Sequence, residues 1–407
     1  MKLYSALLAQ HIGWQFKQIW KVKNNRKIRE TEALKLLTEK GVPVYRPQDL
    51  FEKKEFKQIE EIPDYIPKPA AFDKTHPNWH DKVCHTYKDN NVLIEGLDQA
   101  KIITNTVEIH EGLPVQIVVP KGPSGLDKSV KEIILNSHLF DSEQEKLPKK
   151  KDPERPAWNF PRDFGVTQSR FTKLLITRLL QLIESRSDPN IVKQRHIIND
   201  LQFWYPFQKD GNLIQLQLQG NALITASKPL LPITNESTAN HTLPDIYPID
   251  FTNTLKKEHI YRIQNIYPIE QFIPKSHPHT VFVHYNNLEV KNLYEEEVTV
   301  AQFLGRSLMK TFVVAATYAR QNFGEEVEVL PQPVTVQCVH TDGRIFHFGI
   351  LQLNTLDSSS NSTIKNVWYQ TPQLALFDTC IYKLGKPILE GYNGNVINNL
   401  MALYANA

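Results

Sequence analysis

The segment from Gln332 to Asp357 is the part of this 407-residue sequence that most constrains the fold. It contains two apolar runs on either side of Asp342-Gly343, a dipeptide that accepts the positive φ angles of a two-residue type I′ turn. The segment therefore predicts a β-hairpin in which Cys338 faces His347. The same register pairs Val336 with Gly349 and Val334 with Leu351. Both faces of this hairpin are apolar, which is typical of strands inside a sheet that is covered on both sides.

Other stretches predict helices and strands that complete an α+β fold. Apolar residues at helical spacing predict the helices Val92–Thr106, Asp127–Leu139, Thr167–Ser185 and Thr299–Phe323. Thr299 and Gln302 form a capping box at the start of the last helix, and Gly324 is expected at a left-handed position after its end. Short apolar runs predict strands at Val115–Val119 and Val281–Tyr285, and residues 228–280 are expected to be mostly irregular.

A second hairpin is expected around Lys209-Asp210-Gly211-Asn212, between Phe203–Phe207 and an alternating run from Leu213. Each hairpin follows a long helix, so the fold class is α+β, with a mixed or antiparallel sheet whose two hairpins are packed by long helices. The expected divisions are a segment 1–29, an extended proline-rich arm 30–90 and a globular body 91–407. The repeated helix-hairpin order hints at two similar halves of the body, about 91–227 and 281–407.

The charge of the chain is unevenly distributed. Residues 1–29 hold seven Lys and Arg and no Asp or Glu; removing these seven from 47 basic residues leaves 40 against 44 acidic ones. This amphipathic, acid-free start has the composition of a mitochondrial transit peptide, although an exposed helix of a cytosolic protein has similar features. No run of about 18 apolar residues is present, which excludes an apolar membrane-spanning helix from the prediction. Three scattered cysteines indicate a reducing compartment.

Two groups of residues have the composition of chemical sites. His76, His80 and Cys84 are four residues apart, but Pro77 disfavours a helix there and a structural zinc site needs a fourth ligand. Cys338 lies near His340 and His347, and a Cys beside a His can form an activated thiolate. Their position in the middle of apolar strands instead favours a buried core histidine beside a small apolar cysteine. We therefore expect no catalytic residue, no metal and no cofactor.

Basic clusters provide the candidates for nucleic-acid contact. One cluster is the run Lys149, Lys150 and Lys151 with Arg155 and Arg162, and the other contains Lys121, Lys128 and Lys131. Neutralising RNA phosphates requires such local excess of Lys and Arg. Solvated surface charge is the alternative, and the mildly acidic body favours it over most of the surface.

The run L-P-Q-P-V-T-V-Q-C-V-H-T-D-G-R-I-F-H-F-G-I-L-Q-L-N-T, from Leu330 to Thr355, strongly resembles the animal mitochondrial large-subunit ribosomal protein family numbered thirty-seven. Three further stretches agree with that family: Leu93–Ala100, Glu111–Pro114 and His277–Val283. The resemblance extends from about Pro77 to the C-terminus. It implies a non-catalytic structural protein of the mitochondrial large ribosomal subunit, located in the matrix.

The resemblance also implies partners. They are other mitochondrial ribosomal proteins, above all the related protein numbered thirty in the small-subunit series as a heterodimer partner, and the large-subunit rRNA. From the residues alone, two other functions stay open: a matrix enzyme that uses Cys338 and His347, and a cytosolic interaction scaffold with a basic N-terminal helix.

Overall fold

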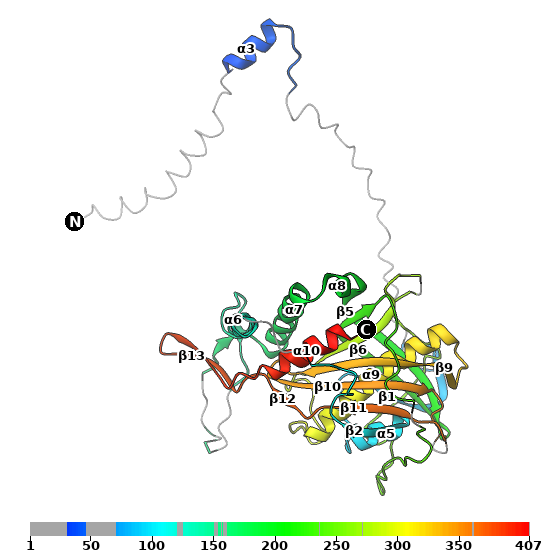
Figure 1. Ribbon diagram of the computed structural model, residues 1–407. Helices are drawn as coiled ribbons and strands as arrows, with labels where there is room; N and C mark the ends of the chain where they lie inside the picture. Colours follow the sequence, from blue (N-terminus) through cyan, green and yellow to red (C-terminus); the bar gives the residue numbers. More distant parts are fainter. Residues whose placement is uncertain are drawn as a thin grey trace, which may run out of the picture. The chain divides into compact units, whose positions relative to one another are not determined.

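A mixed β-sheet organises the larger of two units in this chain, residues 70–407 (Figure 1). The structure is a computed structural model that describes residues 31–45, 71–119, 125–149, 154–155, 157, 161–235, 237–270, 272–359 and 362–406. The other unit, residues 1–69, contributes one described helix, α3 (Glu32–Glu39), which has no buried residue. The N-terminal segment 1–29 and residues 46–70 of the expected proline-rich arm lie outside the described residues.

Ten strands of the described part form the main sheet. Along its path lie β2 (Thr106–Glu111), β11 (Asn366–Gln370), β10 (Ile345–Thr355), β9 (Val329–Thr341), β8 (His277–His284), β6 (Asn212–Ala226), β1 (Trp79–Tyr87) and β7 (Lys256–Ile260). Off this path, β12 (Leu374–Ala375) pairs with β10 and β5 (Arg195–Lys209) pairs with β6. The pairs β1–β6, β2–β11 and β8–β9 are parallel and the others antiparallel. The α+β class with a mixed sheet is therefore confirmed.

The two expected hairpins, β5–β6 and β9–β10, share this one sheet because β8 lies between them. β8 pairs with β6 on one side and with β9 on the other. The β5–β6 turn is the expected two-residue one, with Asp210 and Gly211 at φ angles of 45° and 78°. The proposal of two similar halves stays a prediction.

Helices cover both faces of the sheet (Figure 1). On one face, α9 (Val300–Phe323) packs against the strands and α5 (Leu97–Thr104) packs against α9. The other face is covered by α6 (Leu126–His138), α7 (Gln168–Arg186) and α10 (Asn395–Ala405). The short helix α8 (Pro189–Gln194) leads into β5. This double coverage explains why both faces of β9–β10 are apolar.

The helix α9 lies at the centre of one apolar layer. It begins with the expected capping box, in which the Thr299 hydroxyl accepts from Gln302 N and the Gln302 side chain accepts from Thr299 N. Its close approach to the start of α5 requires glycine, because a Cβ on Gly305 would lie 2.6 Å from the carbonyl carbon of Gly96. After the helix, Gly324 has φ 106° and ψ 157°. The expected left-handed helical conformation is therefore wrong, because φ is positive but ψ is extended.

The register of β9–β10 differs from the expected one. Cys338 pairs with Gly349, and His347 pairs with His340, because the loop is wider than a two-residue turn. The Asp342 carboxylate accepts hydrogen bonds from the backbone N–H groups of Arg344 and Ile345, which opens the loop. The pairing is shifted by two residues, so every side chain keeps its expected face.

Two other expectations are wrong in detail. Val115–Val119 is not a buried strand: Ile117 N donates to Pro114 O in a turn, and Val115 is 96% exposed. The strand of this region is β2, Thr106–Glu111, which pairs in parallel with β11. Residues 79–87, assigned above to the arm, form β1 inside the sheet, so the globular body begins before residue 91. Residues 228–280 are mostly irregular, as expected, apart from β7 and the start of β8.

Candidate functional site

The Cys–His group of the β9–β10 hairpin lies in the interior beneath α9. Cys338, His340 and His347 are completely buried. The hydroxyl oxygen of Ser307, on α9, is 2.9 Å from Nδ1 of His340 and 2.9 Å from Nδ1 of His347. The Phe303 ring stacks on the His340 ring with 3.7 Å between centroids. One serine side chain of α9 thus contacts both imidazoles of the sheet.

Burial sets the protonation of these groups. It raises the pKa of the Cys338 thiol to about 12 and lowers the pKa of His347 to about 4. Burial, and next the Arg306 guanidinium, hold the pKa of His340 well below its ordinary value. At neutral pH the thiol is protonated and both imidazoles are neutral, so no thiolate–imidazolium pair forms. The group is a polar part of the core, as the sequence analysis favoured.

The histidines and cysteine considered above for metal binding are not brought together. His80 and Cys84 lie on strand β1, where a spacing of four separates the two Cα atoms by roughly 13 Å, too far to share a metal ion. His80 is exposed, whereas Cys84 is buried and its Sγ donates to Glu258 O at 3.1 Å. Within the described ranges, no group of three or more His, Cys, Asp or Glu could hold a metal ion.

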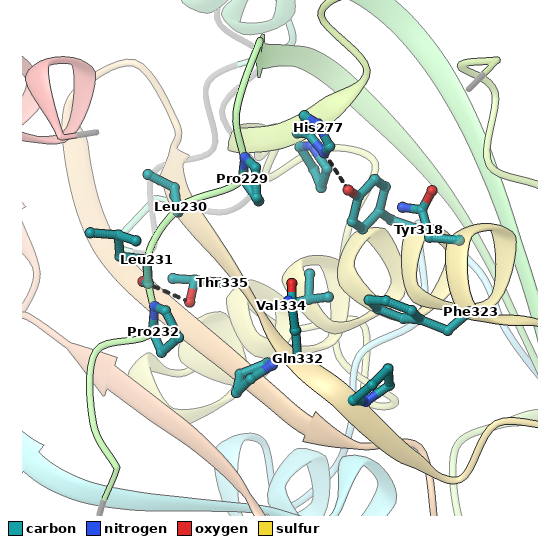
Figure 2. A pocket seen from close by; sticks show the side chains of 14 residues that line it. Pro229, Leu230, Leu231, Pro232, His277, Tyr318, Phe323, Gln332, Val334 and Thr335 are labelled. Carbon is teal, nitrogen blue, oxygen red and sulfur yellow. Dashed lines mark hydrogen bonds between the residues drawn. The ribbon is translucent and has the colours of Figure 1, made fainter. Parts of the chain in front are cut away.

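An apolar cavity of about 460 Å³ opens beside the first residues of β9 (Figure 2). The segment Pro229–Pro232 forms one wall, where Thr335 Oγ1 donates to Leu231 O at 3.1 Å. Tyr318 and Phe323, from the last turns of α9, lie opposite. The residues that the structure places around it include no carboxylate and no lysine or arginine. The cavity is suited to an apolar side chain, and its titratable groups, His277 and Tyr318, are hydrogen-bonded to each other.

The basic residues selected for RNA contact belong to one loop. Its ends are held by the short strands β3 (Glu145–Lys146) and β4 (Phe164–Gly165), and Leu147 N donates to Asp163 O at 2.8 Å. Three of the selected residues, Lys149, Arg155 and Arg162, are exposed; Lys150 and Lys151 lie outside the described residues. The paired ends place Lys149 and Arg162 near the base of the same loop.

Membrane insertion through a helix finds no support in the described part of the chain, where none of the helices has the length and hydropathy to span a bilayer.

The sequence is similar to mitochondrial ribosomal proteins. It is 30% identical over 352 residues to the large ribosomal subunit protein mL37 of Bos taurus, covering 81% of the chain and 76% of the bovine protein. The chain belongs to the mL37 family. The mL37 proteins of Rattus norvegicus and Gallus gallus are 29% and 26% identical, covering 73% and 77% of the chain and 67% and 71% of those proteins. Residues 285–407 match the family described as mitochondrial 28S ribosomal protein S30 (PDCD9).

Membership of the mL37 family fits the buried character of the most distinctive string. Residues 330–355, which carried the resemblance, form most of β9 and β10 at the centre of the sheet. The S30-type match begins at Tyr285, directly after β8, and contains α9, the β9–β10 hairpin and α10. The shared region of the two families is therefore a packed helix and sheet unit rather than a surface motif.

Proposed function

We propose that this chain is a structural component of the mitochondrial large ribosomal subunit, located in the matrix and held there by ribosomal proteins and rRNA. The observation that carries this function is the 30% identity to bovine mL37 over 352 residues. A component of this kind acts through its surface and is not an enzyme. The alternative of a matrix enzyme is not favoured, because the Cys338 thiol is buried and has a raised pKa. Family membership also disfavours a cytosolic scaffold.

Sedimentation of a mitochondrial lysate tests this function. The chain should peak in a sucrose gradient together with large-subunit rRNA, and it should move to lighter fractions when the rRNA is digested. A peak at the size of the free 47.0 kDa chain under every assembly condition would contradict the proposal.

For the partner, we infer a heterodimer with the S30-related ribosomal protein. The match of residues 285–407 to the S30 family supports it, because related chains with the same packed unit can present equivalent surfaces across a pseudo-two-fold axis. Co-expression of the two chains followed by analytical ultracentrifugation measures the association. A 1:1 species is expected; two independent boundaries at micromolar concentration would contradict the pairing.

For rRNA, we propose that the loop closed by β3 and β4 contacts the phosphate backbone through Lys149, Lys150, Lys151, Arg155 and Arg162. The exposure of its described cations supports this role. Reversing Arg155 and Arg162 to Glu should weaken binding to a large-subunit rRNA transcript and reduce its salt dependence. Reversing the exposed Arg186, at the end of α7, serves as the control. Equal losses in both variants would mean that the loop has no special role.

We further propose that residues 1–29 direct import into mitochondria, as their acid-free amphipathic composition indicates. Radiolabelled precursor incubated with energised mitochondria should become protease-protected. Protection that is unchanged after residues 1–29 are removed would refute the assignment.

A further inference from the structure

A two-stranded hairpin stands apart from the main sheet. Its strands are β13 (Thr379–Lys383) and β14 (Lys386–Glu390), which pair only with each other among the described strands. Figure 1 shows β13 projecting away from the layers of the body. All residues from 381 to 387 are exposed. This hairpin was not predicted from the sequence.

The turn of this hairpin contains two features that are unfavourable in the isolated chain. Leu384 has φ 50°, a left-handed conformation that leucine rarely adopts, and its side chain is 93% exposed. Lys383 and Lys386 face each other across the strands, and like charges in opposed positions repel. Glycine or asparagine would suit the turn position better. Local unfavourable features that occur together at an exposed tip indicate a functional surface.

The charge and the aromatic side chains around the turn indicate what this surface binds. No Asp or Glu occurs between Asp378 and Glu390, so the two lysines give the tip a net positive charge. Tyr382 is 59% exposed, and its hydroxyl donates to Gly385 O at 3.0 Å, which fixes the ring beside the turn. The ring of Phe140, 54% exposed, lies 6.2 Å from it in an edge-to-face arrangement.

Phe140 also links the hairpin to the basic loop. It follows α6 and precedes the loop that β3 and β4 close, so the Phe140–Tyr382 contact places the hairpin beside the chain that enters this loop. Lys146, at the loop's base, lies over the Phe164 ring with 5.8 Å between Nζ and the centroid. Exposed rings and cations therefore occur on both elements, which is the composition of surfaces that bind unpaired nucleotides.

We propose that the β13–β14 tip binds an unpaired stretch of RNA that passes over the end of the hairpin, with Lys383 and Lys386 on phosphates at one face and the exposed rings of Tyr382 and Phe140 against a base at the other. Leu384 then packs against the sugar or base beside it. An apolar protein partner would remove both lysines from water without a counter-charge, whereas a phosphate backbone neutralises them. The inference rests on the proposed ribosomal function and adds a second RNA-binding element to the basic loop.

Two variants of the full chain separate the roles of charge and shape. K383Q/K386Q removes the tip charge, and L384G removes the apolar side chain while permitting the positive φ. K228Q/K291Q, at two exposed lysines far along the chain from the hairpin, is the matched control for charge. Binding to an in-vitro transcript of mitochondrial large-subunit rRNA is measured by filter retention from 50 to 200 mM KCl, without other proteins.

The expected results are specific to each variant. K383Q/K386Q should reduce the slope of log K against log [KCl] by about 2, one for each phosphate contact. L384G should bind about tenfold more weakly, since a leucine loses its contact area. Tip variants and control that bind the transcript like the wild type would overturn the proposal. Tip variants that bind the transcript normally but leave the large-subunit gradient fraction would show a protein contact, which also overturns it.

The same experiments separate this inference from the proposed function. A wild-type chain that co-sediments with the large subunit but does not bind the transcript refutes the RNA-binding tip alone. A wild-type chain that never co-sediments refutes the ribosomal function, whatever the hairpin variants do.

Discussion

Acidification from pH 7.5 to 5.5 should destabilise the folded chain through its buried histidines. His279, His340 and His347 have no exposed surface. Burial lowers the pKa of His279 to about 3 and of His347 to about 4, and holds that of His340 well below its ordinary value. In the unfolded chain each imidazole takes up a proton near its ordinary pKa of about 6.5. The unfolded state therefore binds more protons throughout this pH window, and stability falls as pH falls.

The size of the effect follows from the same pKa values. Between pH 7.5 and 5.5 each of these histidines favours the unfolded state by slightly more than 1 kcal/mol, so the three together remove about 4 kcal/mol. Native domains are stable by roughly 5–15 kcal/mol, so this loss is a large fraction of the total. The carboxylates with lowered pKa, such as Asp357 and Asp250, add their own losses only at lower pH.

Urea titrations followed by tryptophan fluorescence at a series of pH values measure the loss. The variant His347→Gln lowers stability at all pH values, but its decisive property is a pH dependence reduced by about 1 kcal/mol over the window. His80→Gln is the control, because that side chain is exposed. A free energy of unfolding that changes by less than about 1 kcal/mol between pH 7.5 and 5.5 would refute the reasoning.

Three further predictions concern packing and reactivity. Gly305→Ala should lower the free energy of unfolding by about 1–3 kcal/mol, because its Cβ would meet the Gly96 backbone; a thermal shift assay with no destabilisation would disprove this contact. Lys310→Met should cost about 3 kcal/mol, because the buried Lys310 ammonium pairs with the Asp89 carboxylate; chemical denaturation would measure it, and a neutral effect would argue against a stabilising pair. Cys338 should react with iodoacetamide far more slowly than free cysteine in the native state and at the free rate in urea, as peptide mass mapping would show; rapid native labelling would contradict its burial.

The sequence predicted elements whose signals are local. The capping box of Thr299 and Gln302 fixes the start of α9, and Asp210-Gly211 makes the two-residue turn of β5–β6. The register of β9–β10 could not be read from the dipeptide Asp342-Gly343, because a side-chain hydrogen bond to two backbone N–H groups decides the loop width. The width of this loop therefore depends on which backbone N–H and C=O groups remain unpaired at the end of the folded sheet.

Expectations that depend on distant partners were less successful. Val115–Val119 has the composition of a strand, but it lies in a turn, whereas Thr106–Glu111 forms β2 and pairs with β11. β1 was hidden within a proline-rich stretch, because its partners β6 and β7 lie more than a hundred residues further along the chain. The run of lysines in the basic loop made it a candidate for RNA contact from the sequence, whereas the β13–β14 tip has only two lysines, which are separated in the sequence. The positive φ of Leu384 could not be predicted from the sequence, because leucine does not indicate this conformation.

The position of β8 between the two hairpins has a consequence for how the chain is made. The β5–β6 hairpin can close by itself as soon as it has entered the matrix, but β8 is some fifty residues further along, and β9 lies beyond the whole of α9. Until β8 arrives, the part of β6 that pairs with it, Ala222–Ala226, has unpaired backbone N–H and C=O groups. β8 in turn needs both β6 and β9 as neighbours before it is stable. Such non-local closure is slow and leaves a strand edge open to wrong pairing. We therefore expect the newly imported chain to depend on a chaperone until residue 355 has entered the matrix.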